Sequence, residues 1–272
     1  EETIVSIVTL ECSARRAEIK TVVENNARDH RLRVIFPSGA TKAKSWLADA
    51  PFDVVERDIH LPETPDWTEP LPETQAASSW FAVSDEKGGL AILTKGIPEA
   101  ACLDDKPHTL ALTLLRGTRR SIGEDYSLEG SQCLGRLEFH YAIQPIASDW
   151  KKHGLVRAAA DFMTPIRAIL SASQRKGSLT NASDYLLLDV KPASAAGNLG
   201  VSCIKKSEDG KSVIIRLWNP TREKIQVKLN LKGQKGETLA VQSDEINPAK
   251  MKKSAGYFTL EHCKIAAFKM TV

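Results

Sequence analysis

Apolar and polar positions alternate with a period of two over most of the chain, which is the pattern of half-buried β-strands. From Ala17 to Glu24, apolar or hydroxyl side chains occupy the odd positions, and charged side chains occupy the even positions with Val22 as the exception. The predicted strands span residues 3–10, 17–24, 31–36, 52–61, 80–84, 90–94, 109–115, 137–143, 185–190, 200–205, 213–218, 225–231, 258–260 and 265–270.

Turn signals separate these strands. Asp85–Gly89 has the composition of a hairpin turn, and Glu208–Gly210 and Asn219–Pro220 mark two further turns. The proline-rich stretch of residues 62–72 cannot continue the interior of a sheet. The sequence therefore predicts strands joined by tight turns, with one longer loop.

One helix is predicted in the middle of the chain. Ser148 and Asp149 form a plausible N-cap, the helix runs through Trp150 towards Phe162, and Pro165 marks its end. A serine-rich stretch from Ser171 to Ser183 follows and predicts a domain boundary. We therefore expect a mostly antiparallel β protein with a large domain over residues 1–172 and a small β-sandwich over residues 184–272.

Charge and hydrophobicity argue against two classes of partner. The 272 residues include 37 basic and 34 acidic side chains, and the basic ones are scattered rather than gathered in a stripe, so no nucleic-acid surface is predicted. The longest apolar runs, such as Leu110 to Leu115, which Thr113 interrupts, are far too short to span a membrane. No signal peptide or lipidation motif is visible, so no membrane partner is expected either.

The five cysteines are dispersed, and no two have the spacing of metal ligands. They predict free, reduced thiols with a structural role in a cytoplasmic protein. The chain opens with Glu1 and shows no methionine before Met163, so we expect it to be the C-terminal part of a larger protein.

No catalytic motif stands out. The six histidines lie in six separate settings, without a His-Glu-x-x-His or His-x-Asp array, and no Gly-x-Ser-x-Gly elbow or glycine-rich phosphate loop occurs. We therefore assign no catalytic residue, metal ligand or cofactor to this chain.

Two arginine-containing segments are the best candidates for binding. On a strand, Asp29, Arg31 and Arg33 share one face. They form either a polar face in which Asp29 neutralises the arginines, or a concave surface for a partner domain or a polyhydroxylated ligand. Arg116 follows the apolar strand of residues 109–115, so it lies at the rim of a sheet or at a solvated strand end.

The five tryptophans could stack on sugar rings, but their dispersion favours a packing role. Trp67, in the proline-rich stretch, is the exception because its setting predicts an exposed side chain.

Several segments together resemble the C-terminal region of glycoside hydrolase family 38 α-mannosidases, and in particular the bacterial branch that includes mannosylglycerate hydrolases. They run in the order of the family over nearly the whole chain, at residues 26–37, 52–57, 67–70, 83–85, 89–93, 109–116, 139–143 and 213–221.

The resemblance implies a galactose-mutarotase-like supersandwich followed by a small β-sandwich. It also implies a parent enzyme that hydrolyses α-mannosides with retention, with an aspartate nucleophile and a zinc ion in an N-terminal α/β domain that precedes Glu1. That catalytic domain would be the partner of this region, which would shape the site rim and support a homo-oligomer. Golgi-type members place an arginine at the edge of the mannose site, and Arg116 matches that position.

Two alternatives stay open. The chain could be a carbohydrate-binding module that holds mannosides by itself. It could also be a mutarotase or epimerase, which needs a general base and acid across a concave face, and His30 and His140 are the strand histidines to test.

Overall fold

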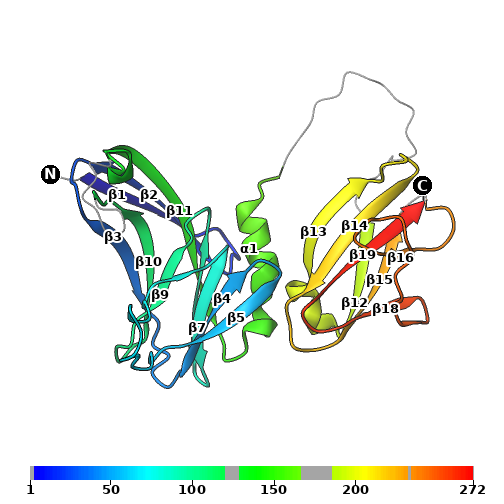
Figure 1. The fold of residues 1–272 in the computed structure, drawn as a ribbon, viewed down its shortest axis with the longest axis horizontal. Coiled ribbons are helices and arrows are strands. Elements are labelled where there is room, and N and C mark those ends of the chain that lie inside the picture. Colours follow the sequence, from blue (N-terminus) through cyan, green and yellow to red (C-terminus); the bar gives the residue numbers. More distant parts are fainter. Residues whose placement is uncertain (1–2, 120–128, 167–185, 232–233, 272) are drawn as a thin grey trace. The chain divides into compact units, whose positions relative to one another are not determined.

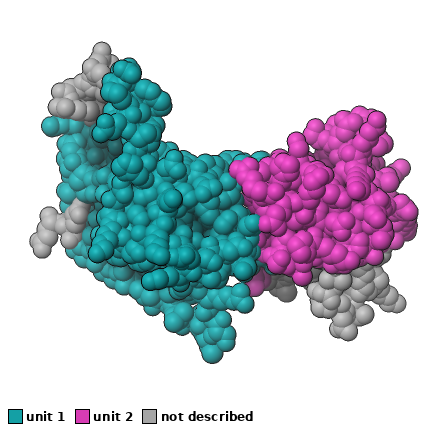
Figure 2. Space-filling model, turned by 90° about the horizontal axis from the view of Figure 1, so that it is seen from below, with its two compact units in different colours: residues 1–163 teal, residues 164–272 magenta. Residues whose placement is uncertain are grey.

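The computed structural model describes residues 3–119, 129–166, 186–231 and 234–271. It divides into two compact units, residues 1–163 and residues 164–272 (Figure 1, Figure 2). Every strand pairing among the described residues is antiparallel, which confirms the predicted fold class. The predicted boundary, Ser171 to Ser183, lies outside the described residues. No helix in the described ranges is long and apolar enough to cross a membrane.

The first unit contains two sheets. The large sheet has seven strands, in the order β1 (Thr3–Thr9), β2 (Ala17–Asn25), β11 (Gly135–Ile146), β8 (Gly88–Thr94), β7 (Trp80–Asp85), β4 (Ser45–Ala50) and β5 (Asp53–Asp58). The small sheet has four, in the order β3 (Arg31–Pro37), β10 (Thr109–Arg116), β9 (Glu99–Cys102) and β6 (Gln75–Ala76). This arrangement is the supersandwich-type domain that the family resemblance implied.

The core of the first unit lies between these sheets. Phe81 and Ile92 of the large sheet and Leu110 and Leu112 of the small sheet are fully buried in it. The rings of Phe36 in β3 and Tyr141 in β11 meet edge to face at 6.1 Å, so β3 covers β11. The predicted alternation in β2 is confirmed, because its odd positions from residue 19 onward are buried and the even ones are not.

The predicted helix is broken into two pieces. Asp149 caps a 3₁₀ helix, η2 (Trp150–His153), by accepting a hydrogen bond from the backbone N–H of Lys151 at 3.1 Å. Gly154 then adopts a left-handed conformation (φ 58°), and α1 (Leu155–Met163) begins after it. The prediction of one continuous helix is therefore wrong, because a residue with positive φ ends a helix.

The sequence pattern did not predict some of the strands. The missed strands β4, β9 and β16 (Leu239–Val241) contain alanine at buried positions, and alanine has a low strand propensity. The strand predicted from residue 52 to residue 61 spans only β5, Asp53–Asp58. It begins one residue late because Phe52 has a positive φ of 63° in the turn between β4 and β5, and residues 59–61 lie beyond its end. A second 3₁₀ helix, η1 (Glu129–Gln132), precedes β11.

The second unit is the predicted β-sandwich. One four-stranded sheet has the order β12 (Leu186–Lys191), β15 (Ile225–Leu231), β18 (Tyr257–Leu260) and β17 (Lys253–Ser254). The other has the order β13 (Gly200–Lys206), β14 (Ser212–Asn219), β19 (Lys264–Thr271) and β16, and the 3₁₀ helix η3 (Ala193–Asn198) joins β12 to β13. Ile215, Leu217, Val227 and Phe268 are fully buried between the two sheets.

Candidate functional site

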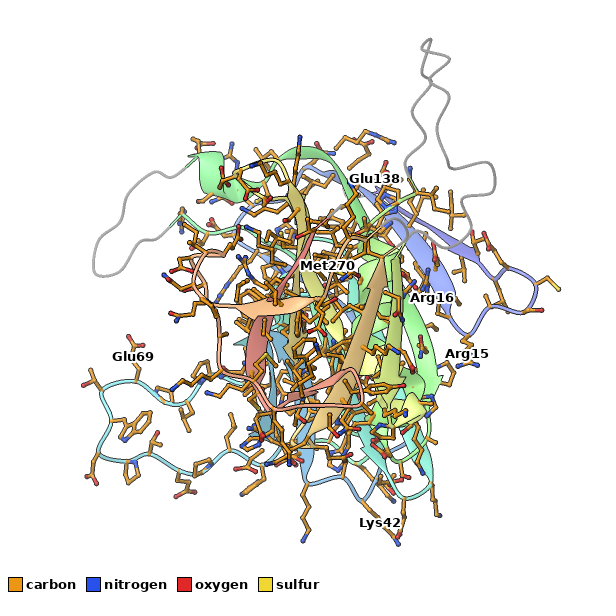
Figure 3. The ribbon with its side chains drawn as sticks, turned by 90° about the vertical axis from the view of Figure 1, so that its right-hand side faces the viewer. Arg15, Arg16, Lys42, Glu69, Glu138 and Met270 are labelled. Carbon is orange, nitrogen blue, oxygen red and sulfur yellow. The ribbon has the colours of Figure 1, made fainter. Side chains whose placement is uncertain are left out.

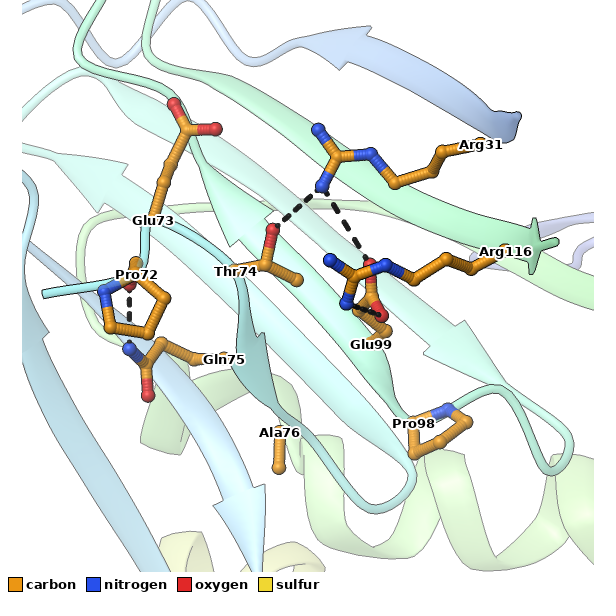
Figure 4. A pocket seen from close by; sticks show the side chains of 9 residues that line it. All are labelled: Arg31, Pro72, Glu73, Thr74, Gln75, Ala76, Pro98, Glu99 and Arg116. Atoms are coloured by element: carbon orange, nitrogen blue, oxygen red, sulfur yellow. Dashed lines mark hydrogen bonds and ion pairs between the residues drawn. The ribbon is translucent and has the colours of Figure 1, made fainter. Parts of the chain in front are cut away.

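A groove with a volume of about 510 Å³ lies over the small sheet of the first unit (Figure 4). Its lining comes from the ends of β3 and β10, from β6 and β9, and from the residues that lead into them. The lining residues are Arg31, Pro72, Glu73, Thr74, Gln75, Ala76, Pro98, Glu99 and Arg116. Two residues singled out from the sequence, Arg31 and Arg116, therefore meet in one groove.

A β-bulge places Arg116 in this groove. The register of β10 against β3 shifts between Thr113 and Leu115, so that one extra residue is accommodated. Without the shift, Leu115 would lie opposite Arg31; with it, Arg116 does. The bulge thus brings two arginines side by side at the sheet end.

Both arginines reach the same carboxylate (Figure 4). Nη1 of Arg31 lies 3.9 Å from Oε1 of Glu99, and Nη1 of Arg116 lies 3.6 Å from Oε2 of Glu99. Arg31 also donates a hydrogen bond of 3.3 Å to the hydroxyl of Thr74. The ion-pair distances to Glu99 exceed normal hydrogen-bond length, so neither guanidinium donates a short hydrogen bond to this carboxylate.

Glu99 was not identified from the sequence, and neither was Glu73. Nη1 of Arg33 lies 3.5 Å from Oε2 of Glu73, which gives the neighbouring arginine its own carboxylate. The set of three arginines and two glutamates carries an excess of one positive charge. Neither glutamate shows a motif in the sequence, because both reach the arginines only through strand pairing and loop placement.

Asp29 contacts residues of neighbouring loops rather than the arginines of β3. Gln132 donates a hydrogen bond to Asp29 at 3.0 Å, and Arg119 lies 3.6 Å from its other oxygen. The hydrogen bond from Gln132, followed by the backbone N–H and charge of Arg119, lowers the pKa of Asp29. Asp29 therefore interacts with Arg119 and Arg28, whereas Arg31 and Arg33 pair with Glu99 and Glu73.

Trp67 is exposed, as predicted, with 61% of its surface accessible. It belongs to the loop between β5 and β6, where Glu69 projects away from the sheets (Figure 3). Trp46 and Trp80 are buried, and the rings of Trp80 and Trp150 lie 5.4 Å apart, which confirms the packing role predicted for most tryptophans.

The structure does not bring the two strand histidines together. His140 lies on the face of β11 opposite to the core-facing Tyr141, and its ring nitrogen lies 2.8 Å from Glu138. His30 directly precedes β3 in the other sheet. His140 thus faces away from the core between the two sheets, and the mutarotase alternative stays a prediction for each histidine separately.

The described residues contain no group of three histidine, cysteine, aspartate or glutamate side chains that could hold a metal ion. The zinc ion implied by the resemblance thus has no fitting ligand set in the described parts of this chain. None of the five cysteines forms a disulfide, and Cys102 is buried while Cys12 is exposed.

Two family models match the chain. "Glycosyl hydrolases family 38 C-terminal domain" matches residues 1–124, and "Glycosyl hydrolases family 38 C-terminal beta sandwich domain" matches residues 198–268. A "Putative mannosylglycerate hydrolase" of Halalkalibacterium halodurans is 30% identical over 244 residues, which cover 87% of this chain and 24% of that relative.

Solved structures share the fold over nearly the whole chain. An alpha-mannosidase from Enterococcus faecalis V583 superposes with a TM-score of 0.81 at 23% identity, covering 98% of this chain and 28% of that one. A second Enterococcus faecalis protein, in the Glycosyl Hydrolase Family 38, gives a TM-score of 0.81 at 22% identity, covering 98% and 29%. The chain thus spans about a quarter of each relative, and it belongs to glycosyl hydrolase family 38, of which it carries the C-terminal domains.

Proposed function

We propose that this chain is the non-catalytic C-terminal β region of a retaining α-mannosidase, and that the groove of Arg31, Glu99 and Arg116 forms part of the rim of the sugar site. The observation that carries the proposal is the match of two C-terminal domains of one glycosidase family to a chain that spans about a quarter of its relatives. The cytoplasmic location inferred from the cysteines belongs to this proposal.

The division of labour follows from the chemistry of glycoside hydrolysis. Retention requires two carboxyl groups, one as nucleophile and one as acid and base, about 5 Å apart across the scissile bond. In the proposed parent enzyme these groups and the zinc ion lie in the catalytic domain, on which this region packs. The zinc ion would there polarise and orient the bound sugar.

The groove suits a sugar because of its donors. A guanidinium offers several N–H groups in one plane, and the hydroxyls of a mannoside are matching acceptors. Arg31 and Arg116 hold Glu99 at 3.9 and 3.6 Å, so their N–H groups can turn to a ligand without breaking short hydrogen bonds. Arg116 is the more exposed of the two, with 64% of its side chain accessible against 35% for Arg31.

The test compares two proteins with an aryl α-mannoside as substrate. The parent enzyme should release the aryl group and this chain alone should not. Turnover by the chain alone would overturn the proposal that this region is non-catalytic. A parent protein that is folded but inactive would overturn the proposal that the parent is an α-mannosidase.

The exposed Trp67 favours one other function, that of a carbohydrate-binding module. An exposed indole offers an apolar face to a sugar ring. Titration of the chain with mannose and mannobiose, followed by tryptophan fluorescence, tests this function. Saturable binding that disappears in Trp67→Ala would favour a carbohydrate-binding module over a role at the rim of the sugar site.

A further inference from the structure

Strand β1 lacks the alternation that marks a half-buried strand. Its sequence, Thr-Ile-Val-Ser-Ile-Val-Thr, places aliphatic side chains on both faces, and all seven residues are exposed. Ile4, Val5, Ile7 and Val8 are between 47% and 63% exposed. A strand with aliphatic residues on both faces is typical of a position that is covered on both sides.

The neighbouring strand shows where the cover ends. In the register of β1 and β2, Ile4 lies opposite Val23, and Val8 lies opposite Ile19. Val23 and Ile19 are buried in the core of the first unit, whereas Ile4 and Val8 on the same face are exposed. Among the described residues, the second layer of the sandwich therefore covers β2 but not β1.

No described strand pairs with the outer edge of β1, and the strand itself carries none of the usual protective residues. Edge strands in soluble proteins are commonly interrupted by lysine, proline or a bulge, which prevents pairing with another strand. β1 has no charged residue and no register shift against β2. The arginines of this hairpin, Arg15 and Arg16, lie in the turn after the strand (Figure 3).

Strand β13 in the second unit provides the contrast. It also lies at the edge of its sheet and exposes Ile204. However, it carries Lys205 and Lys206 and has a bulge between Val201 and Cys203. Both devices are those of an edge that faces water, and β1 has neither.

We propose that β1 is an interior strand of the parent enzyme. A β-strand from the part of the parent that this chain does not contain pairs with the outer edge of β1. Side chains of that same part cover both faces of β1. This inference rests on the proposed function. The size of the relatives supports this occupant, because the chain spans 24% of the curated relative and 28% of the solved α-mannosidase. A second copy fits less well, since antiparallel β1–β1 pairing would place four exposed aliphatic side chains, Val5 and Ile7 of each copy, on one open face.

Residue-resolved amide hydrogen exchange in the parent enzyme tests the pairing. In an edge strand alternate N–H groups face solvent, whereas an interior strand bonds every N–H group. We expect all β1 amides to exchange at least about tenfold more slowly than in the unfolded peptide, independently of protein concentration. Fast exchange at alternate residues would overturn the proposal, and so would protection that is lost on dilution, because a second copy would then be the partner.

A pair of substitutions tests the covered faces. Ile7→Lys should lower the Tm of the parent enzyme by about 5 °C or more, because it buries a charge. Ile204→Lys, at a similarly exposed isoleucine of β13, should leave the Tm within about 1 °C. Equal shifts would contradict the proposal. The α-mannosidase activity of the same preparation is measured separately. An inactive parent whose β1 amides are protected from exchange would contradict the proposed function but not the proposal for β1.

Discussion

Arg116 and Arg31 lie directly opposite one another on β10 and β3, and both guanidinium groups reach the carboxylate of Glu99. One carboxylate thus serves two cations. Since a lone carboxylate balances only one of them, the pair keeps a positive charge and unused N–H donors at the groove. A ligand rich in oxygen atoms would complete this arrangement.

Substitution of Arg116 tests its place at the sugar site. In the parent enzyme, Arg116→Ala should lower kcat/KM by more than about tenfold, a loss above roughly 1.4 kcal/mol of transition-state stabilisation. Arg157→Ala is the matched control, because Arg157 is similarly exposed (71% against 64%) and binds its own carboxylate, Asp161, at 2.8 Å. Unchanged kinetics in folded Arg116→Ala enzyme would remove Arg116 from the site.

Asp49 makes the stability of the first unit depend on pH. Burial raises the pKa of this carboxyl to about 6, although hydrogen bonds from Ser79 oppose the shift. Between its ordinary pKa of 3.8 and about 6, the folded state holds a proton that the unfolded state has lost. Stability from Asp49 is therefore fully present below the lower value and is lost as the pH rises through the upper one, by on the order of 3 kcal/mol.

Asp49→Asn should abolish this loss. In urea unfolding at pH 4 and pH 7, wild type should lose stability relative to the variant as the pH rises. Asp85→Asn gives the opposite sign, because backbone N–H groups of Lys87 and Lys42 lower the pKa of Asp85. For the Asp85 pair, the stability of wild type relative to the variant should rise with pH below the ordinary pKa of 3.8 and should change little between pH 4 and pH 7. Parallel curves for the Asp49 pair would show that the pKa of this carboxyl is not shifted.

Gly200 is required by its cross-strand partner, Trp218. A Cβ atom on Gly200 would lie 1.8 Å from Nε1 of the indole, so the ring packs directly on the glycine backbone. Gly200→Ala should reduce the free energy of unfolding by about 1–3 kcal/mol. The loss should shrink in a Trp218→Ala background, and Gly130→Ala, which meets no atom within 4 Å, is the control. An equal loss in both backgrounds would contradict this contact.

Asn219 joins three segments of the β-sandwich. Its buried amide donates to the carbonyls of Glu223 at 2.7 Å and Glu261 at 3.1 Å, and its oxygen accepts from Thr221. Asn219→Ala should cost about 2–4 kcal/mol in urea unfolding, because it leaves buried carbonyls without a donor. Asn219→Asp should be no better at neutral pH, since a carboxylate cannot donate to these carbonyls. Retained stability in either variant would show that water replaces the amide.

The thiols should differ in reactivity. Burial is the main cause that raises the pKa of Cys102 to about 12, so almost no thiolate forms at pH 8. Cys12 is exposed in the turn after β1. With a disulfide reagent at pH 8, Cys12 should react in the folded chain and Cys102 only after unfolding. Cys12→Ser should remove the fast phase, and fast labelling of Cys102 would contradict its burial.

Much of the fold was predictable because burial leaves a local record. In β2, core-facing and solvent-facing positions alternate, so the period of two appears in the residues themselves. β4 and β9 left a weak record, because their alanines are small enough for a crowded core yet do not favour strands. The family resemblance rested on short segments spread along the whole chain, and the family models bear it out.

The amino-acid sequence alone determined the antiparallel β architecture, the two-part organisation and Arg31 and Arg116 as candidate binding residues. Only the tertiary structure decided that these arginines share Glu99, that Glu73 serves Arg33, and that β1 lies uncovered at a sheet edge. The reason is physical. Alternation reflects the environment of each single residue, whereas a counterion or a cover comes from segments far away in the chain, whose register and bulges depend on the whole sheet.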